Sequence, residues 1–217
     1  MEIKMEKRKV QSKWRYFLAF LIGTLIFIDG FLLANSLSYL EFQRISEAQT
    51  TLSFQIFQDK LKYALFSEDI CSENSLRKIS EDLGFQGRII DDLERKLGKN
   101  DKTVLFRKRY YTLVELEHFE FVKQINKECG DNISTILFFY SNEQKDVEDS
   151  EDVGNLLSVV YRRNPEVLIY SFDVNLDSEL IDGLVKKYDV EQSLTVIINE
   201  EHRLVAPKNI EEIENLL

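Results

Sequence analysis

The side chains best suited to chemistry, two cysteines and two histidines, are scattered along this chain of 217 residues. They are Cys71, Cys129, His118 and His202. A zinc site needs cysteine and histidine ligands in close pairs, and no such pair occurs in this sequence. No set of nucleophile, base and acid is recognisable either, although such sets assemble in space rather than at fixed spacings. From these residues we predict no catalytic residue, no metal and no cofactor.

One strongly apolar stretch predicts a membrane-spanning helix. Residues 16–37 supply the roughly 20 residues that are needed to cross about 30 Å of hydrocarbon. Six basic side chains against two acidic ones lie within residues 1–15, so the N-terminus is expected in the cytoplasm and the body outside it. The alternative is a cleaved signal peptide with Ala34-Asn35-Ser36 at its cleavage site. We favour the anchor because helical patterning continues through residues 40–66 without a turn signal.

Asp29 interrupts the apolar stretch, past its midpoint and toward the outer face. A carboxylate at the centre of a span costs about 2.5–3.5 kcal/mol on insertion scales. Two interpretations remain. Asp29 is tolerated near the interface, or it makes a helix–helix contact in a homodimer or with a partner membrane protein.

Residues 38–130 show helical periodicity in three blocks, which predicts an antiparallel, coiled-coil-like helical stalk. Gly98 and the three residues after it form the turn signal between the second and third blocks. A tight turn there brings the start of the second helix, near Cys71, to the end of the third, near Cys129. A disulfide between them would stabilise the fold by about 4 kcal/mol in the chain-entropy model. The alternatives are two buried free thiols or a redox-active pair. His118 falls on the apolar stripe of the third block, as a core histidine with a hydrogen-bond partner would.

From residue 134 the pattern changes to short apolar strands separated by helices. The expected order is βαβαββα, which implies a mixed four-stranded sheet covered on both faces. The fold class is therefore α+β overall, with the α/β part at the C-terminus. The expected elements are strands at 136–140, 167–172, 194–199 and 202–205 and helices at 153–163, 178–188 and 210–217.

This terminal part resembles thioredoxins. Phe138-Phe139-Tyr140-Ser141 is similar to the strand that leads into the thioredoxin active-site loop, and Thr195 to Asn199 is similar to the strand after the family's cis-proline. The layout resembles membrane-anchored archaeal proteins with a helical stalk and a terminal thioredoxin-like domain. It implies a basic N-terminus (1–15), a transmembrane helix (16–37), a three-helix stalk (38–130) and a thioredoxin-like domain (134–217).

The residues that perform thioredoxin chemistry are missing. The resemblance places the family's two cysteines at Lys145 and Glu148, and its cis-proline at Leu194, where we expect a trans peptide. Thiol–disulfide exchange needs an attacking thiolate and a resolving thiol, and this loop has neither. The acidic run from Glu143 to Asp152 lacks the spacing of a calcium site and is expected to be a solvated loop.

Charge excludes one class of partner. The chain has a formal net charge of −10, and its basic excess is confined to the N-terminus, so nucleic-acid binding is not expected. The leading hypothesis is a non-catalytic, membrane-tethered module that binds another protein outside the cytoplasmic membrane. The alternatives are a thiol oxidoreductase that uses Cys71 and Cys129, and a structural stalk that dimerises through its first helix and Asp29.

Overall fold

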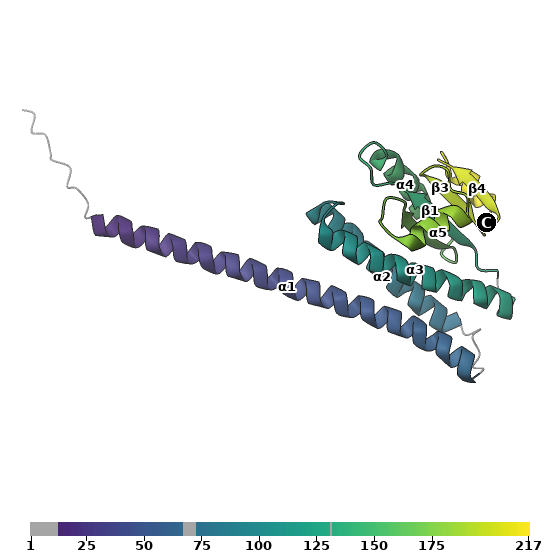
Figure 1. Cartoon of the computed structure of the whole chain (residues 1–217), viewed down its shortest axis with the longest axis horizontal. Coiled ribbons are helices and arrows are strands. Elements are labelled where there is room, and N and C mark those ends of the chain that lie inside the picture. The colour runs from purple at the N-terminus through teal and green to yellow at the C-terminus, as the bar shows by residue number, and fades with distance from the viewer. Residues whose placement is uncertain (1–12, 67–72, 131) are drawn as a thin grey trace, which may run out of the picture. The chain divides into compact units, whose positions relative to one another are not determined.

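The computed structural model describes residues 13–66, 73–130 and 132–217. The chain divides into two compact units, Met1–Glu47 and Ala48–Leu217. The first helix, α1 (Lys13–Phe66), begins in the first unit and ends in the second. The second unit holds the remaining helices and the sheet (Figure 1).

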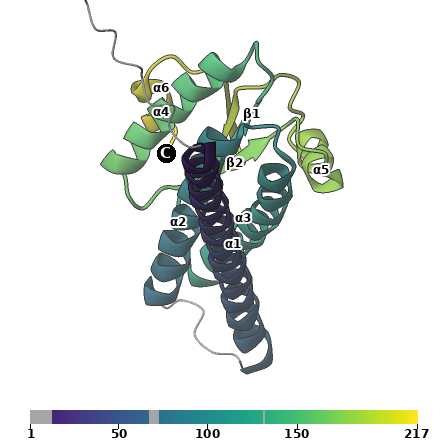
Figure 2. The same cartoon turned by 90° about the vertical axis from the view of Figure 1, so that its left-hand side faces the viewer.

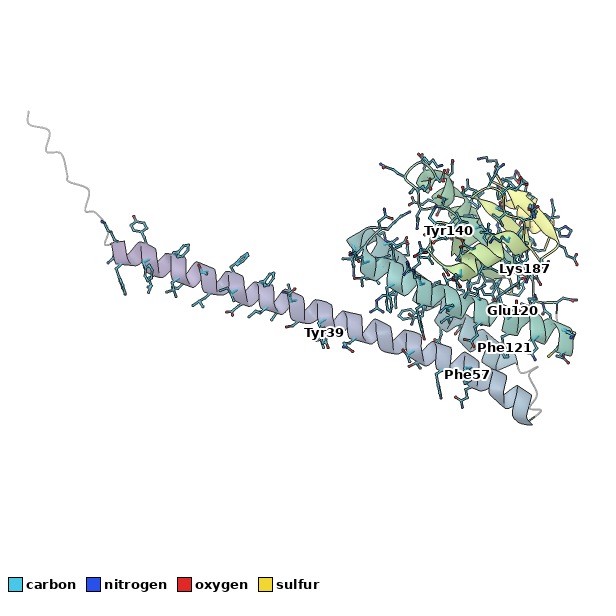
Figure 3. All side chains as sticks on the ribbon, viewed as in Figure 1. Tyr39, Phe57, Glu120, Phe121, Tyr140 and Lys187 are labelled. Carbon is cyan, nitrogen blue, oxygen red and sulfur yellow. The ribbon has the colours of Figure 1, made fainter. Side chains whose placement is uncertain are left out.

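The first part of α1 is apolar on every side. The segment Lys13–Leu37 is 25 residues long and apolar enough to cross a membrane, as a signal sequence near an N-terminus also is. Large apolar side chains project outward all along it, with Phe20 73% and Phe27 74% exposed (Figure 3). Asp29 is exposed on the same helix. A helix with apolar side chains all round its axis needs an apolar environment.

Two helices form an antiparallel hairpin at the start of the second unit. They are α2 (Glu73–Leu97) and α3 (Lys102–Cys129), joined at the turn signal expected from the sequence. Gly98 adopts φ +92°, a left-handed conformation that glycine enters without steric cost. The Asp101 side chain then caps α3 by accepting a hydrogen bond of 2.8 Å from the Thr103 N–H. These two residues end one helix and start the next within four positions.

The C-terminal elements form a mixed four-stranded sheet in the predicted order βαβαββα, and the strands lie in the order β2-β1-β3-β4. Strands β1 and β2 are parallel, whereas β3 pairs antiparallel with both β1 and β4. The elements are β1 (Thr135–Tyr140), α4 (Val147–Arg163), β2 (Leu168–Asp173), α5 (Glu179–Lys187), β3 (Thr195–Ile198), β4 (His202–Val205) and α6 (Ile210–Glu214).

Helix α4 begins six residues earlier than the predicted start at Val153. Much of the acidic run that was predicted to be a loop therefore lies in this helix. Glu148 and Asp149 occupy its first turn, where negative side chains interact favourably with the positive end of the helix dipole. Apolar periodicity begins only at Val153, which is why the sequence pattern misplaced the start.

Helices cover both faces of the sheet, as expected. On one face α4 and α6 pack against Ile136, Phe138 and Val196, and on the other face α3 and α5 pack against Leu137, Phe139 and Phe172. Figure 2 shows α4 and α6 on one side of the strands and α5 on the other. The predicted boundary near residue 130 falls between α3 and β1, but α3 shares one core with the sheet. Whether residues 38–130 form a stalk of their own stays a prediction.

The core shared by α3 and the sheet predicts that truncating a buried side chain of α3 destabilises the whole C-terminal part. Phe119 on α3 is 1% exposed and meets the Tyr170 ring of β2 edge-on at a centroid distance of 5.3 Å. We expect Phe119→Ala to lower the free energy of unfolding by about 3–5 kcal/mol, because it opens a cavity in the common core. Urea unfolding of the full chain in detergent, followed by near-ultraviolet circular dichroism, measures this loss.

The matched control is Leu113→Ala, which truncates a side chain that is 47% exposed on the same helix. We expect it to change stability by no more than about 0.5 kcal/mol. Hydrogen exchange of the β1 and β2 amides should accelerate in Phe119→Ala alone. Unchanged exchange in the strands would contradict a shared core.

Candidate functional site

Three of the predicted site residues lie near the end of β1, where the Leu194 N–H donates to the Phe139 carbonyl at 2.7 Å. Lys145 is exposed in the turn after β1, with its ammonium 3.2 Å from the Glu143 carboxylate, and Glu148 lies in the first turn of α4. Leu194 precedes β3 with φ +68° and a trans peptide bond, since the described residues contain no cis peptide. The expected trans peptide is therefore confirmed.

Cys129 ends α3 and is disulfide-bonded. Cys71 lies outside the described residues, so the Cys71–Cys129 pairing stays a prediction. About 21 residues separate Cys129 from Lys108 on α3, or roughly 30 Å along the helix axis. The sulfur is therefore far from the end of β1, where Lys108 lies.

Three charged side chains from three elements meet beside the end of β1, and we call them the ion-pair cluster: Glu94 of α2, Lys108 of α3 and Asp173 of β2. The Lys108 ammonium lies 2.6 Å from Glu94 Oε1 and 2.7 Å from Asp173 Oδ2. Only 6% of the Lys108 side chain and 3% of the Asp173 side chain are exposed. The ammonium also lies 5.0 Å from the centre of the Tyr140 ring, which Figure 3 labels. Burial of this charge is tolerable because both carboxylates accept its hydrogen bonds.

The electrostatics of the cluster keep Lys108 protonated. Desolvation acts to lower the pKa of its ammonium, but Tyr140, Asp173 and Glu94 outweigh that effect and raise the pKa. An amine nucleophile or a general base has to lose this proton at working pH. The cluster is therefore suited to holding elements together and not to proton transfer.

The loop after β1 is fixed by its own hydrogen bonds. Asn175 Oδ1 accepts from the Ser141 hydroxyl at 2.8 Å and from the Asn142 N–H at 2.9 Å. The Ser150 hydroxyl on α4 donates to the Ser141 carbonyl at 2.9 Å. The Asn142 amide donates to Asp173 Oδ2 at 2.8 Å, which joins the loop to the ion-pair cluster. A thiol-free, hydrogen-bonded turn occupies this position.

A hollow of about 690 Å³ opens beside the cluster, between the α2–α3 hairpin and α4, and we call it the hairpin groove. Its size is within the usual range for ligand sites, about 300–1,000 Å³. Six of the residues that line it are Gly84, Lys108, Glu115, Asn142, Gly154 and Ser171.

Glu115 is the most unusual group in the hairpin groove. It is 2% exposed, and its Oε1 accepts a hydrogen bond of 3.1 Å from the Ser171 N–H of β2. Its Oε2 has no hydrogen-bond partner among the described residues. Burial raises the pKa of this carboxyl from 4.5 to about 8, although the Ser171 N–H acts to lower it.

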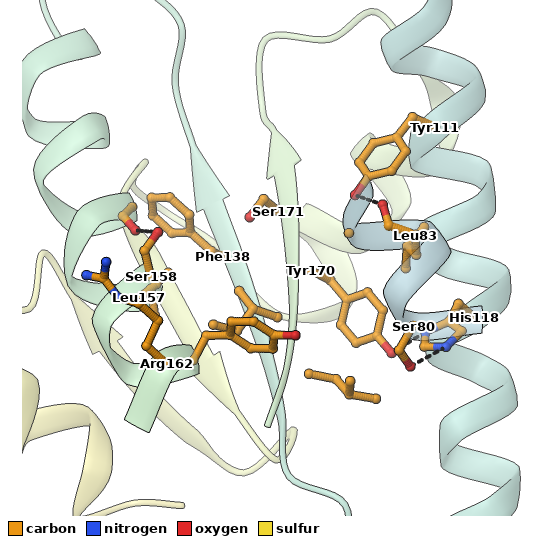
Figure 4. A pocket seen from close by; sticks show the side chains of 15 residues that line it. Ser80, Leu83, Tyr111, His118, Phe138, Leu157, Ser158, Arg162, Tyr170 and Ser171 are labelled. Carbon is orange, nitrogen blue, oxygen red and sulfur yellow. Dashed lines mark hydrogen bonds between the residues drawn. The ribbon is translucent and has the colours of Figure 1, made fainter. Parts of the chain in front are cut away.

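A second hollow of about 380 Å³, the inner pocket, continues from the hairpin groove. Both are lined by Gly84, Tyr111, Gly154, Ser158, Ile169 and Ser171. In the inner pocket the Tyr170 side chain points toward Ser80 and His118, with Ser158 and Arg162 of α4 on the opposite side (Figure 4). His118 Nδ1 lies 2.8 Å from the Tyr170 hydroxyl and Nε2 lies 3.2 Å from the Ser80 hydroxyl. The expectation of a core histidine with a polar partner is confirmed.

Sequence reasoning missed Lys108, Glu115, Glu94 and Asp173. A signal existed for the first two, because residues 108, 111, 115 and 118 are spaced by 3, 4 and 3 along the apolar stripe of α3. A charged residue on a buried stripe implies a buried partner. The partners Glu94 and Asp173 come from other elements, and no pattern in the sequence identified them.

Comparison with known proteins identifies no relative of this chain. No protein-family model matches it, and the searches of curated proteins and of solved structures return no significant match. Among the described residues, no group of three or more histidine, cysteine or acidic side chains is placed to hold a metal ion.

The raised pKa of Glu115 predicts a specific dependence of stability on pH. Between pH 4.5 and about 8 the native protein keeps the Glu115 proton and the unfolded chain loses it. The native state then binds more protons, so stability falls with rising pH by up to about 1.4 kcal/mol per unit and levels off above the folded pKa. Glu115→Gln keeps an acceptor for Ser171 and removes the titration.

The measurement is the free energy of unfolding of wild type minus that of Glu115→Gln at several pH values from 5 to 9. We expect this difference to fall as the pH rises. Leu113→Ala, which removes no titratable group from an exposed position of the same helix, should give a flat difference. A flat difference for Glu115→Gln would show that its carboxyl ionises normally in the native state.

Proposed function

We propose that this chain is a non-catalytic, membrane-tethered module that binds another protein on the outer face of the cytoplasmic membrane through a thioredoxin-like C-terminal domain. The observation that carries the proposal is the end of β1. In thioredoxins a strand of this kind leads to the reactive dithiol, whereas here Ser141 and Asn142 are hydrogen-bonded next to the ion-pair cluster.

The strand arrangement supports the thioredoxin-like assignment. A parallel pair, β1 and β2, is extended by two antiparallel strands, and helices cover both faces. This is the βαβαββα order that the resemblance implies. The positions assigned to the family's cysteines, Lys145 and Glu148, do lie where β1 leads into α4.

A role in binding rather than catalysis is supported by what the site retains. The hairpin groove is of ligand size and has a buried carboxyl oxygen, Glu115 Oε2, without a partner in the described part of the chain. None of the described residues that line the groove or the inner pocket is a cysteine. A module with an open groove and no thiol in it is suited to holding a partner without altering it.

The membrane tether is supported by α1. Its apolar segment is exposed on all sides, and the helix continues past Asn35 to Phe66 without a break. A continuous helix favours an anchor over a cleaved leader. The basic residues before the segment favour a cytoplasmic N-terminus.

The proposal predicts that the protein lacks disulfide-reductase activity. In an insulin-reduction assay with dithiothreitol, we expect the purified full chain to match the rate of the variant Cys71→Ser,Cys129→Ser, because the loop after β1 contains no cysteine. Thioredoxin serves as the positive control. Turnover that disappears in Cys71→Ser would instead establish the oxidoreductase alternative.

If α1 is a membrane anchor, the protein should stay attached to the membrane and keep the mass of the uncleaved chain. The full chain should stay in the membrane pellet after alkaline carbonate extraction and show its uncleaved mass in mass spectrometry. Leu25→Arg places a charge in the span at a cost of about 2.5–3.5 kcal/mol and should release a measurable fraction. Leu180→Arg, on an exposed position of α5, is the matched control.

The side of the membrane on which the C-terminal domain lies is tested by adding protease to intact cells from which any outer membrane and cell wall have been removed. The C-terminal domain should be digested while cytoplasmic markers survive. A protected domain, or a mass that begins after Ser36, would overturn the predicted orientation or the anchor respectively.

A further inference from the structure

Within the described part of the chain, the second strand of the sheet pairs with another strand along one edge only. β2 is the terminal strand of the order β2-β1-β3-β4, and its strand partner is β1. The N–H groups of Leu168 and Val174 donate to the β1 side, to Ser134 and Tyr140 at 2.9 Å each. Because backbone groups alternate along a strand, those of Ile169, Ser171 and Asp173 face the opposite edge.

That edge opens into the space described above. Ile169 and Ser171 line both the hairpin groove and the inner pocket. Unpaired N–H and C=O groups on an edge strand are a template for pairing with another chain. Peptide-binding domains use such edges by adding the peptide as one more strand.

The walls of the space leave room for a strand. Gly84 of α2 and Gly154 of α4 line both hollows. A side chain added at Gly154 would meet nothing within 4 Å, and one added at Gly84 would meet only the Arg88 guanidinium at 3.7 Å. Neither helix therefore fills the space above the β2 edge with its own side chains at these positions.

Glu115 supplies the polar observation. One of its oxygens accepts from the outward N–H of Ser171. The other has no hydrogen-bond partner among the residues that the structure describes, although Glu115 is only 2% exposed. An extended peptide carries an N–H and a C=O at every residue. One of its N–H groups can therefore donate to this oxygen, beside the Ser171 N–H that Glu115 already accepts. A purely apolar ligand would leave it without a partner.

Charge in the groove defines the kind of segment that fits. Lys108 is paired with Glu94, Lys99 with Glu151 at 3.2 Å, and Arg95 with Asp91 at 2.8 Å. With Arg88 and Glu115, the lining of the hairpin groove holds four basic and four acidic side chains, and the inner pocket adds Arg162. The groove therefore presents both signs of charge in equal number. Apolar groups face the strand position from both sides, from Leu83 on α2 and from Leu157 on α4. An uncharged segment with apolar side chains on both faces complements these walls.

We propose that the β2 edge binds a short, extended, uncharged segment of the partner protein as an added strand. The added strand ends at Ser171, whose N–H is already hydrogen-bonded to Glu115. This inference rests on the proposed binding function and names the place and conformation of the bound partner. Backbone pairing at Ile169 gives affinity, and the apolar walls select the side chains.

The test uses the full chain in its native membranes. The photo-crosslinking residue p-benzoylphenylalanine replaces Ser158, which lines the groove. On irradiation, this variant should crosslink to a segment of another protein. The same probe in place of Val205, on β4 at the opposite edge of the sheet, should not. Mass spectrometry of the adduct identifies the segment, which should be uncharged.

Two glycine variants separate groove binding from other contacts. Gly154→Leu fills the groove and keeps α4 intact, because leucine is a better helix former than glycine. Gly183→Leu is the matched control, since it lies on α5 away from the groove and also has no atom within 4 Å of the added Cβ. We expect Gly154→Leu to reduce the crosslinked adduct by about tenfold or more and Gly183→Leu to leave it unchanged, as tenfold corresponds to about 1.4 kcal/mol.

Strand addition itself is read from hydrogen exchange. In the complex purified from membranes, the Ile169 amide should exchange about tenfold more slowly than in the free protein. If the partner copurifies but Gly154→Leu binds it normally, or Ile169 is not protected, the groove inference fails while the binding function stands. If no protein copurifies, the binding function itself fails. An adduct with a second copy of this chain would show an edge-to-edge dimer and overturn the inference.

Discussion

One buried ammonium joins the parts of the second unit. Lys108 on α3 bonds a carboxylate from α2 and another from the end of β2, so a single cation connects three elements. Such an arrangement is costly to desolvate and costly to break, because loss of one partner leaves buried charge unpaired. Together with the apolar core that α3 shares with the sheet, it connects the hairpin to the strands beside the groove.

The same interaction also holds the loop after β1. Asp173 accepts from both Lys108 and Asn142, so the loop after β1 is hydrogen-bonded to a group that is already neutralised. A reactive thiolate would require positive charge directed at itself. Here the available positive charge is committed to two carboxylates. The loop after β1 contains no cysteine, and its polar groups are hydrogen-bonded to Asn175 and Asp173.

The order of the C-terminal elements could be predicted because short apolar strands and amphipathic helices alternate with clear turn signals. Residues such as Ile136 and Val196 lie in uninterrupted apolar runs, which are typical of buried strands.

The start of α4 could not be found by apolar periodicity, since its first turn contains acidic residues. The ion-pair cluster could not be found at all, because Lys108 and Asp173 are 65 residues apart and only the fold brings them together. The packing of α3 on the sheet was missed for a related reason. A stripe on a helix indicates that something covers it, but not what.

The contact between Glu115 and Ser171 has a consequence for chains at high local concentration. Copies of a protein that meet often can pair along their edge strands and polymerise. A carboxyl group that already occupies one backbone donor interrupts the continuous ladder that fibrous growth requires. A short visiting segment can still use the rest of the edge. A single glutamate would then separate recognition from self-association.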